Sequence, residues 1–362
     1  MSLLAAARLP RFPAASRIDA VGIALWGLRI AVVLVVVIGT IGSLIKARYT
    51  GAQWFDLVMF GLTIGSIYAQ IALGYTMVYG VLRMINFAHG EIVMSGAFAG
   101  YFVATAFDHS GLLTQSPLPT MAAVVAVAVL TSTSIALLAE RIAYRPFRRS
   151  GGLAPLICAF GVSFFLQQTF RGMFGTAVRS YPDPLWQRAA FHIFGYTVPH
   201  LDVLVVGLAL LFMLALYLIV QRTRMGTAMR AVAEDAEAAA LMGIDINKIV
   251  VFTFALGGAM AGIAGVFYSM VYKQVYFFMG FTPGLKAFGA AVLGGIGSIP
   301  GAMLGGFFLG MVESVGPSLF LDGLGIPAPY QLRDLIAFTL LIMVLIFRPQ
   351  GIFGERMAKR RA

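Results

Sequence analysis

The sequence predicts an all-α integral membrane protein with about 8–10 transmembrane helical segments, some of them short or broken. Of its 362 residues, 60% are hydrophobic and only 11% are charged, with a mean hydropathy of +0.89. Soluble domains carry roughly 25% charged residues. The apolar residues also fall in runs of about 20, the length at which a helix crosses ~30 Å of hydrocarbon. A soluble protein of this composition could not keep its surface hydrated.

The apolar runs define the predicted helices in order. Clear candidate spans lie near residues 21–45, 54–80, 87–107, 118–139, 153–170, 201–220, 249–272 and 331–347. A further Gly-rich run, 284–320, is long enough for two short helices but not for two full spans. Because Gly and Pro interrupt helices, the sequence "GGIGSIPG" at residues 294–301 is the predicted turn between them.

The basic residues favour an orientation with the N-terminus in the cytoplasm. The segments that this orientation places inside are 1–20, Arg83, 141–149, 221–248 and 348–362. They hold 17 of the 26 Lys and Arg residues, the outside segments hold 8, and one lies within the first span. Because short basic loops stay inside, both termini are predicted to be cytoplasmic. The basic tail is inside only if the run 284–320 forms two helices.

Residues 54–91 and 249–290 share a weak likeness of layout. Each segment is a long Gly-containing helix, then a break, then a helix rich in Gly and Ala. In the orientation above, the two long helices run in opposite directions. Interrupted segments of opposite sense are typical of transporters built from inverted repeats, although Gly-broken helices also occur in other membrane proteins.

Three polar residues, Asn86, His89 and Glu91, interrupt an apolar run at the first break. Ionisable groups inside a membrane are candidates for function by default. Three interpretations stay open: they line a translocation path, they satisfy backbone groups freed at the break, or they lie at the cytoplasmic interface. In a structural role, Asn86 would be the N-cap of the next helix. Glu91 would lie in its first turn, where the helix dipole favours negative charge.

The turn at residues 294–301 is the second candidate for the path. Gly294, Gly295 and Gly297 precede a proline there, between two short helices. Backbone at such a break must be satisfied by protein or water, so it is expected to face a pathway or a packed neighbour. Gly295→Leu is therefore expected to be more harmful than Gly280→Leu, which would lie in an external loop.

The longest charged stretch, residues 221–248, is predicted to form a cytoplasmic helix with ends near Gly226 and Gly243. Such stretches are most often solvated loops. However, "EAAALMG", residues 237–243, resembles the EAA-x-x-x-G core of a cytoplasmic loop in bacterial ABC importer permeases, where a helix-turn-helix docks on the ATPase. The Ile-x-Leu-Pro part of that motif is missing. The candidate docking residues are Glu234, Glu237, Ala238, Ala239 and Gly243.

Four segments together extend this resemblance to most of the chain. They are "ALGYTMVYGVLRMINFAHGEIVMSGAF", "ERIAYRPFRRS", "RMGTAMRAVAEDAEAAALMGI" and "GLKAFGAAVLGGIGSIPGAMLGG". In this order they resemble the LivH-type permease of branched-chain amino acid ABC importers, over roughly residues 54–354. This implies an inverted-repeat ABC importer permease domain (51–354) and a cytoplasmic basic tail (355–362). Residues 1–50 would be an N-terminal extension with an extra transmembrane helix, which is favoured over a cleaved signal peptide.

The resemblance also implies partners and a location. The partners are a second permease of the LivM type, two cytoplasmic ATPases that hold ATP and Mg, and a periplasmic amino-acid-binding protein. The location is the bacterial inner membrane. The chain itself contains no GxxxxGK[ST] phosphate loop, so it is not expected to bind a cofactor or to hydrolyse ATP by that route.

The implied function is uptake of leucine, isoleucine, valine or related apolar amino acids. Within the same superfamily, urea and short-chain amides are alternative substrates. A passive channel or a membrane enzyme remains a further alternative. No pair of histidines has metal-ligand spacing, no base is evident beside Ser95, Ser163 or Thr169, and no nucleic-acid motif accompanies the basic residues. We therefore expect no metal site, no catalytic residue and no nucleic-acid partner.

Overall fold

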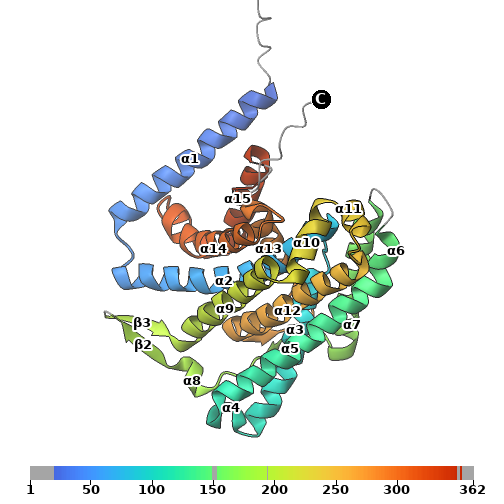
Figure 1. Ribbon diagram of the computed structural model, residues 1–362. Coiled ribbons are helices and arrows are strands. Elements are labelled where there is room, and N and C mark those ends of the chain that lie inside the picture. The colour runs from blue at the N-terminus through green and yellow to red at the C-terminus, as the bar shows by residue number, and fades with distance from the viewer. Residues whose placement is uncertain (1–19, 149–152, 194, 349–350, 353–362) are drawn as a thin grey trace, which may run out of the picture. The chain divides into compact units, whose positions relative to one another are not determined.

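Figure 1 shows the computed structural model, which describes residues 20–148, 153–193, 195–348 and 351–352. The longer helices are α1 (Ala20–Lys46), α2 (Gly51–Leu82), α3 (His89–His109), α5 (Pro117–Ala139), α7 (Ala154–Phe174), α9 (His200–Arg222), α10 (Arg224–Glu234), α12 (Ile246–Tyr272), α13 (Phe281–Gly294), α14 (Ile299–Gly316) and α15 (Arg333–Phe347). The short ones are α4 (Leu112–Gln115), α6 (Arg145–Phe147), α8 (Leu185–Arg188), α11 (Ala236–Leu241), the π-helical turns η1 (Glu140–Tyr144) and η2 (Pro317–Leu321), and the 3-10 turn η3 (Pro329–Leu332).

Every predicted span coincides with a helix. Within the described residues, eight helices are long and apolar enough to cross a membrane. The predicted pair in the Gly-rich run is also present, as α13 and α14. At 1.5 Å per residue, the 14 residues of α13 cover only about 21 Å, so α13 is short as predicted. The following helix is not, because the apolar helical stretch continues from Ile299 to Leu321.

The all-α fold is confirmed, and two small sheets lie in the loops. The segment between α7 and α9 contains an antiparallel hairpin of β2 (Ala190–Ile193) and β3 (Tyr196–Pro199). A second two-stranded sheet joins β1 (Arg179–Ser180) to β4 (Gln274–Val275). These strands satisfy backbone groups in loops outside the predicted spans, and the spans themselves stay helical.

The chain divides into two compact units, one of residues 1–48 with 317–329 and the other of residues 49–316 with 330–362. In the first unit, the Lys46 ammonium donates to the Gly323 carbonyl at 2.8 Å. Arg48 pairs with Asp322 at 2.9 Å. These bonds fasten the end of α1 to the turn after η2. Most other side chains of α1 are apolar and exposed, as lipid contact requires.

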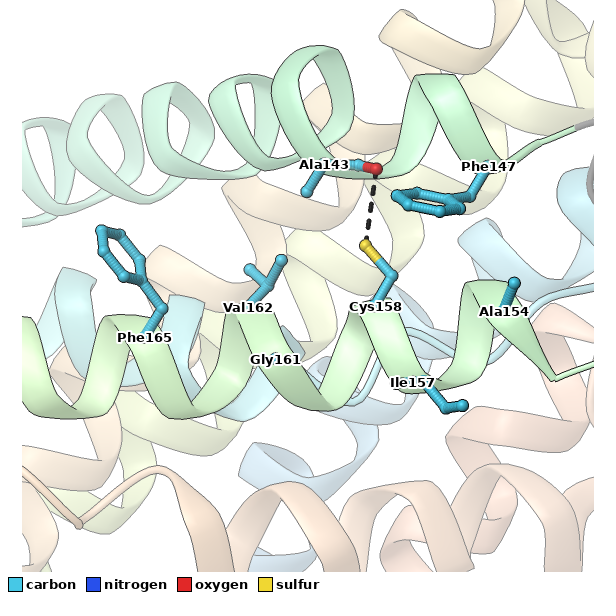
Figure 2. A pocket seen from close by; sticks show the side chains of 8 residues that line it. All are labelled: Ala143, Phe147, Ala154, Ile157, Cys158, Gly161, Val162 and Phe165. Atoms are coloured by element: carbon cyan, nitrogen blue, oxygen red, sulfur yellow. Dashed lines mark hydrogen bonds between the residues drawn. The ribbon is translucent and has the colours of Figure 1, made fainter.

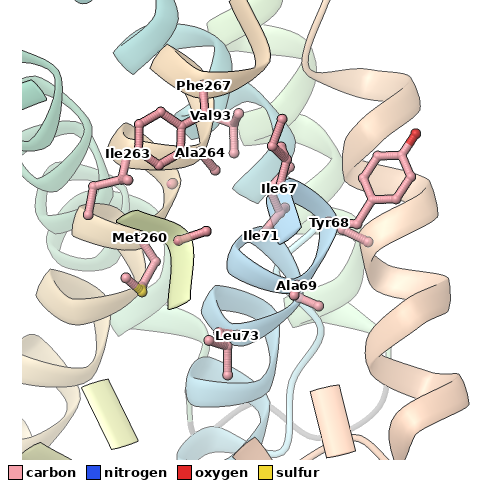
Figure 3. Packing of buried hydrophobic residues seen from close by; sticks show 14 of the residues in the cluster. Ile67, Tyr68, Ala69, Ile71, Leu73, Val93, Met260, Ile263, Ala264 and Phe267 are labelled. Carbon is pink, nitrogen blue, oxygen red and sulfur yellow. The ribbon is translucent and has the colours of Figure 1, made fainter. Parts of the chain in front are cut away.

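The core of the second unit is built on α2, α3 and α12. Helix α2 packs against α12, α13 and α14, while α12 also packs against α3 and α5. Figure 3 shows Ile67 and Ile71 of α2, Val93 of α3, and Ala264 and Phe267 of α12 in this core. All of these side chains are fully buried, so α2 and α12 form the rigid centre around which the other helices are placed.

Small residues set the distance between α2 and α14. A Cβ atom at Gly310 would overlap the backbone of Gly65, and one at Gly306 would overlap Ala69. In lipid, helix association depends on close van der Waals packing, which such residues permit. The glycines of α2 and α14 thus allow the two helix backbones to contact each other directly.

Two features support the predicted repeat. The segments "YTMVY", residues 75–79, and "YSMVY", residues 268–272, occupy the last turns of α2 and α12. After each helix, a basic residue takes the left-handed conformation: Arg83 with φ of 56° and Lys273 with φ of 54°. A non-glycine residue there is uncommon, and two of the four in the described residues follow α2 and α12.

Candidate functional site

The three polar residues of the first break are enclosed by protein. Asn86, His89 and Glu91 are each exposed by 2% or less. They lie where α2 has ended and α3 begins. Since burying polar groups without hydrogen bonds costs free energy, their partners decide what each of them does.

Asn86 is not the N-cap of α3, contrary to the sequence-based prediction. The N-cap is Ala88, which has no side-chain cap. The Asn86 carbonyl accepts from the N–H of His89 at 3.1 Å. Its side-chain Oδ1 accepts from the Tyr144 hydroxyl at 2.7 Å. The prediction was wrong because Tyr144, on η1 and distant in sequence, takes the side chain that a local cap would have used.

Glu91 lies in the first turn of α3, and that prediction is confirmed. Its Oε1 accepts from Gln167 Nε2 at 3.2 Å and lies 3.5 Å from Ser163 Oγ. Both partners belong to α7. Its other carboxyl oxygen, Oε2, is buried without a hydrogen-bond partner among the described residues. Glu91 therefore ties the break to α7 while keeping one oxygen available.

His89 fills a gap left by a glycine on α2. A Cβ atom at Gly74 would overlap its imidazole ring. The ring of Tyr75 meets it edge-on, with 4.8 Å between centroids. The Nε2 atom has no hydrogen-bond partner among the described residues. The imidazole also has a hydrogen bond with the backbone of Ile71 on α2. It is thus held by that bond and by close packing, between α2 and the start of α3.

The starts of α3 and α13 touch each other through glycines. A Cβ atom at Gly280 would overlap the Gly90 carbonyl, and one at Gly90 would meet the Gly280 carbonyl. Gly280 lies in the loop before α13, as expected, but it is buried there, so the expectation of a mild effect does not hold. We now expect Gly280→Leu to reduce the yield of folded protein at least as much as Gly295→Leu, measured by size-exclusion chromatography of membrane extracts. A milder effect of Gly280→Leu would contradict this contact.

The Gly-rich turn has a tight backbone. Gly295 and Gly297 have φ of 101° and 99°, values that other residues rarely adopt. A Cβ atom at Gly294 would overlap the Gly301 carbonyl, so α13 and α14 touch backbone to backbone there. The N–H of Ile352 donates to the Leu293 carbonyl at 2.7 Å. The turn is thus a packed junction rather than a loose loop.

The sequence analysis missed a buried ion-pair network. Lys286 is one of the eight basic residues that the sequence analysis placed in outside segments. It lies within α13 instead, with 3% of its side chain exposed. Its ammonium is 2.7 Å from Glu313 on α14 and 2.7 Å from Asp334 on α15. It also lies 3.4 Å from the Tyr68 hydroxyl. A buried charge must be paired, and this pairing joins three helices to α2.

The predicted cytoplasmic helix is two helices. Asp235 separates α10 from α11 and caps the latter by accepting from the N–H groups of Glu237 and Ala238, at 2.9 and 3.0 Å. Gly243, with φ of 86°, follows the end of α11 as predicted. Helix α10 begins at Arg224, near Gly226 as predicted, and Gly226 is buried in its first turn. It packs there against the Val220 carbonyl.

The tip of this loop exposes apolar side chains. Leu241 is 89% exposed and Met242 is 83% exposed. Glu234, Glu237 and Ala238 are also exposed, whereas Ala239 is buried against the protein. Exposed apolar surfaces of this kind are typical of sites that contact a partner protein or a membrane.

The loop is fixed to the long core helices at both ends. Arg83, just after α2, donates to the Ala233 carbonyl in the last turn of α10 at 3.2 Å. Asp245 caps α12 by accepting from the N–H groups of Lys248 and Asn247. These two hydrogen bonds lower the pKa of the Asp245 carboxyl, and the bond from the Lys248 N–H contributes most. The cap is therefore intact at neutral pH and is lost only as the pH falls through the lowered pKa.

One pocket in the described part of the chain is apolar. Figure 2 shows it between the η1–α6 segment and α7, with a volume of about 570 Å³. Ala143, Phe147, Val162 and Phe165 line it, and Cys158 Sγ lies 3.4 Å from the Ala143 carbonyl. No charged side chain lines it, so it offers nothing that would hold a charged solute.

Comparison with known proteins decides the family. The family model described as "branched-chain amino acid transport system / permease component" matches residues 57–345. The chain belongs to this permease family. It is 43% identical to the high-affinity branched-chain amino acid transport system permease protein BraD of Pseudomonas aeruginosa. The 306 aligned residues cover 84% of this chain and 96% of that protein.

Other relatives agree. The permease protein LivH of Escherichia coli is 40% identical over 298 residues, 82% of this chain and 94% of that protein. Both relatives are named as transport permease proteins and not as enzymes. An inward-facing ABC transporter of metal-chelate type matches 90% of this permease with 16% identity and a TM-score of 0.43. The matched family region begins after α1.

Proposed function

We infer that this chain is the membrane-spanning permease subunit of an ABC importer that carries branched-chain amino acids into the cell. The observation that carries this function is the family match over residues 57–345, together with two relatives at 40–43% identity. As a component of an ABC transport system, the permease works with ATPase subunits. The absence of a phosphate loop from its sequence fits this division of labour.

The α10–α11 loop is the proposed docking site for an ATPase. Leu241 and Met242 would enter a cleft on the ATPase, and the exposed carboxylates Glu234 and Glu237 would fix the register at its rim. The Arg83–Ala233 bond connects the end of α10 to the break after α2. A movement of the docked loop would therefore pull on the segment that carries Asn86 and His89.

The translocation path is proposed to pass the junction of the broken helices. The starts of α3 and α13 meet at Gly90 and Gly280. Beside them lie the Nε2 of His89 and the Oε2 of Glu91, which have no hydrogen-bond partner among the described residues. Small and apolar walls with a few polar atoms suit the passage of an apolar amino acid with weak affinity. The full assembly proposed is this chain, a second permease of the LivM type, two ATPases and a periplasmic amino-acid-binding protein, in the inner membrane.

Reconstitution tests this function. The permease and its partner subunits, in vesicles that contain ATP, are expected to accumulate L-leucine when loaded binding protein is added outside. Urea and acetamide should not be accumulated. Vesicles that contain the non-hydrolysable analogue AMP-PNP are the control. Uptake of urea without leucine would assign the chain to the amide permeases, and leucine entry without ATP would make it a channel.

The proposed orientation has both termini in the cytoplasm and is tested by thiol labelling. After Cys158, the single native cysteine, is replaced by Ser, cysteines are introduced at Ser180 and Met242, both exposed positions. An impermeant thiol reagent added to whole spheroplasts is expected to label the cysteine at 180 and not that at 242. The opposite pattern would invert the topology.

A further inference from the structure

The segment between β4 and α13 reaches deep into the protein although it is not helical. Residues 276–280 form turns, and the last of them contacts Gly90 of α3. The neighbouring His89 ring lies against Gly74 of α2, which in turn meets the middle of α12 at Gly257. The turns therefore run from the end of α12 to the level of its middle.

Backbone of this kind cannot face lipid. Non-helical backbone at membrane depth occurs only where it is buried in protein or lines a water-filled cavity. Met279 and Gly280 are buried. Phe278 is 39% exposed and Phe281, the first residue of α13, is 40% exposed. Their rings stack with 4.9 Å between centroids. The exposed surface of this aromatic pair therefore faces a water-filled space or another protein.

Helix α13 continues the exposed surface as a narrow stripe. Phe281, Leu285, Phe288 and Val292 are half-buried or exposed and follow the spacing of one helix face. Apart from Thr282, every other residue of α13 is buried. The stripe begins at the α3–α13 junction and ends at the Gly-rich turn. It therefore connects the junction with the turn that the sequence analysis named as a candidate for the path.

The stripe is apolar because the single charge of α13 lies on another side of the helix. Lys286 is only 3% exposed and is bound within the ion-pair network. At the lower part of the stripe, Phe288 lies 5.7 Å from the ring of Phe87, which stacks on Phe160 of α7 with 4.3 Å between centroids. The surface thus offers an apolar solute contact with aromatic and aliphatic side chains and no strong polar binding.

We propose that Phe278 and Phe281 contact the side chain of the passing amino acid and limit its size, and that the stripe of α13 is the wall along which it moves. This proposal rests on the proposed function and identifies which residues at the α3–α13 junction act on the substrate. The pair is open on one side because, in the proposed assembly, the second permease supplies the opposite wall of the passage.

Access of water to the pair separates a passage from a contact with lipid or protein. Phe278→Cys and Phe281→Cys are made separately in the full chain with Cys158→Ser, and the complex with its partner subunits is placed in vesicles. A methanethiosulfonate reagent with a trimethylammonium group should modify both cysteines, as followed by mass spectrometry, and should stop ATP-driven leucine uptake. Leu130→Cys, at a position 67% exposed on α5, is the lipid-facing control and should stay unmodified.

The size limit is tested by the ratio of leucine uptake to valine uptake. Initial rates are measured with saturating binding protein loaded with each amino acid, and the ratio is divided by that of the wild type, which cancels the preference of the binding protein. Phe278→Trp and Phe281→Trp narrow the passage and should each lower the ratio about tenfold, the discrimination that one methylene gives in an apolar pocket. Phe308→Trp, at a 44% exposed position on α14, should leave it unchanged.

Two results would overturn the proposal. If the reagent modifies neither cysteine of the pair, the pair is covered by lipid or by the second permease. If the uptake ratio in the two Trp variants equals that of the wild type, the pair does not limit the size of the solute. The ratio does not depend on the amount of folded complex, so a low yield does not imitate the expected result. Failure of the wild type to take up leucine would instead contradict the proposed function.

Discussion

Replacing Gly310 with leucine is expected to abolish the accumulation of folded protein. A Cβ atom there would lie on the N and Cα atoms of Gly65. Backbone on a buried core helix cannot rotate away as a side chain can. Overpacking of ordinary cores costs about 1–3 kcal/mol, and we expect more here because α2 and α14 must separate along their length. Yield of monodisperse protein from membranes is the measurement.

Leu304→Ala is the matched control for this substitution. Leu304 lies on the same helix with 48% of its side chain exposed, so its truncation should leave the yield nearly unchanged. If Gly310→Leu accumulates like wild type, the close approach of α2 and α14 does not exist in the membrane.

Replacing Lys286 with methionine is expected to destabilise the protein strongly. Removing one member of a buried ion pair costs about 3–5 kcal/mol, because the remaining charge is left without its partner. Among the charged groups of the described residues, Glu313 would keep Arg333, at 3.7 Å. Chemical denaturation in micelles measures the free energy of unfolding. Lys248→Met is the control, since Lys248 is 80% exposed and a surface pair contributes little.

The double variant Lys286→Met/Glu313→Met separates pairing from packing. Replacing a whole buried pair with apolar residues of similar size is often neutral, so the double variant should recover most of the lost stability. Additive losses from the two substitutions would show that the pair is not coupled.

Helix positions followed closely from the sequence because hydropathy alone identifies segments that must satisfy their backbone groups within lipid. The Gly-rich run was divided correctly, since "GGIGSIPG" contains both Gly and Pro between apolar stretches. The first-turn place of Glu91 also followed, because a helix start after a break is a local feature.

Contacts between distant residues could not be predicted in this way. In the sequence, Lys286 has no nearby partner and was therefore placed outside the membrane. Its charge is neutralised by Glu313, which lies on another helix. The side chain of Asn86 has a local alternative as a cap and a distant partner in Tyr144, and only the packing of η1 decides between them. The loop position of Gly280 could be predicted, but its close contact with the Gly90 backbone could not. The exposed tip could have been predicted from the sequence, because two large apolar residues, Leu241 and Met242, directly precede Gly243 in the charged loop.

Retention of the ATPase subunits tests the central claim most directly. The permease carries an affinity tag and is co-expressed with its partner permease and ATPases, in wild-type form and as Leu241→Asp/Met242→Asp. Both side chains are more than four-fifths exposed, so the substitution should not disturb folding. Ser180→Asp, at an exposed position outside the predicted spans, controls for added charge. We expect the wild type and the control to retain the ATPases after purification and the double variant to lose them, together with ATP-driven leucine uptake. Full retention and uptake by the double variant would contradict the assignment of α10–α11 as the docking site.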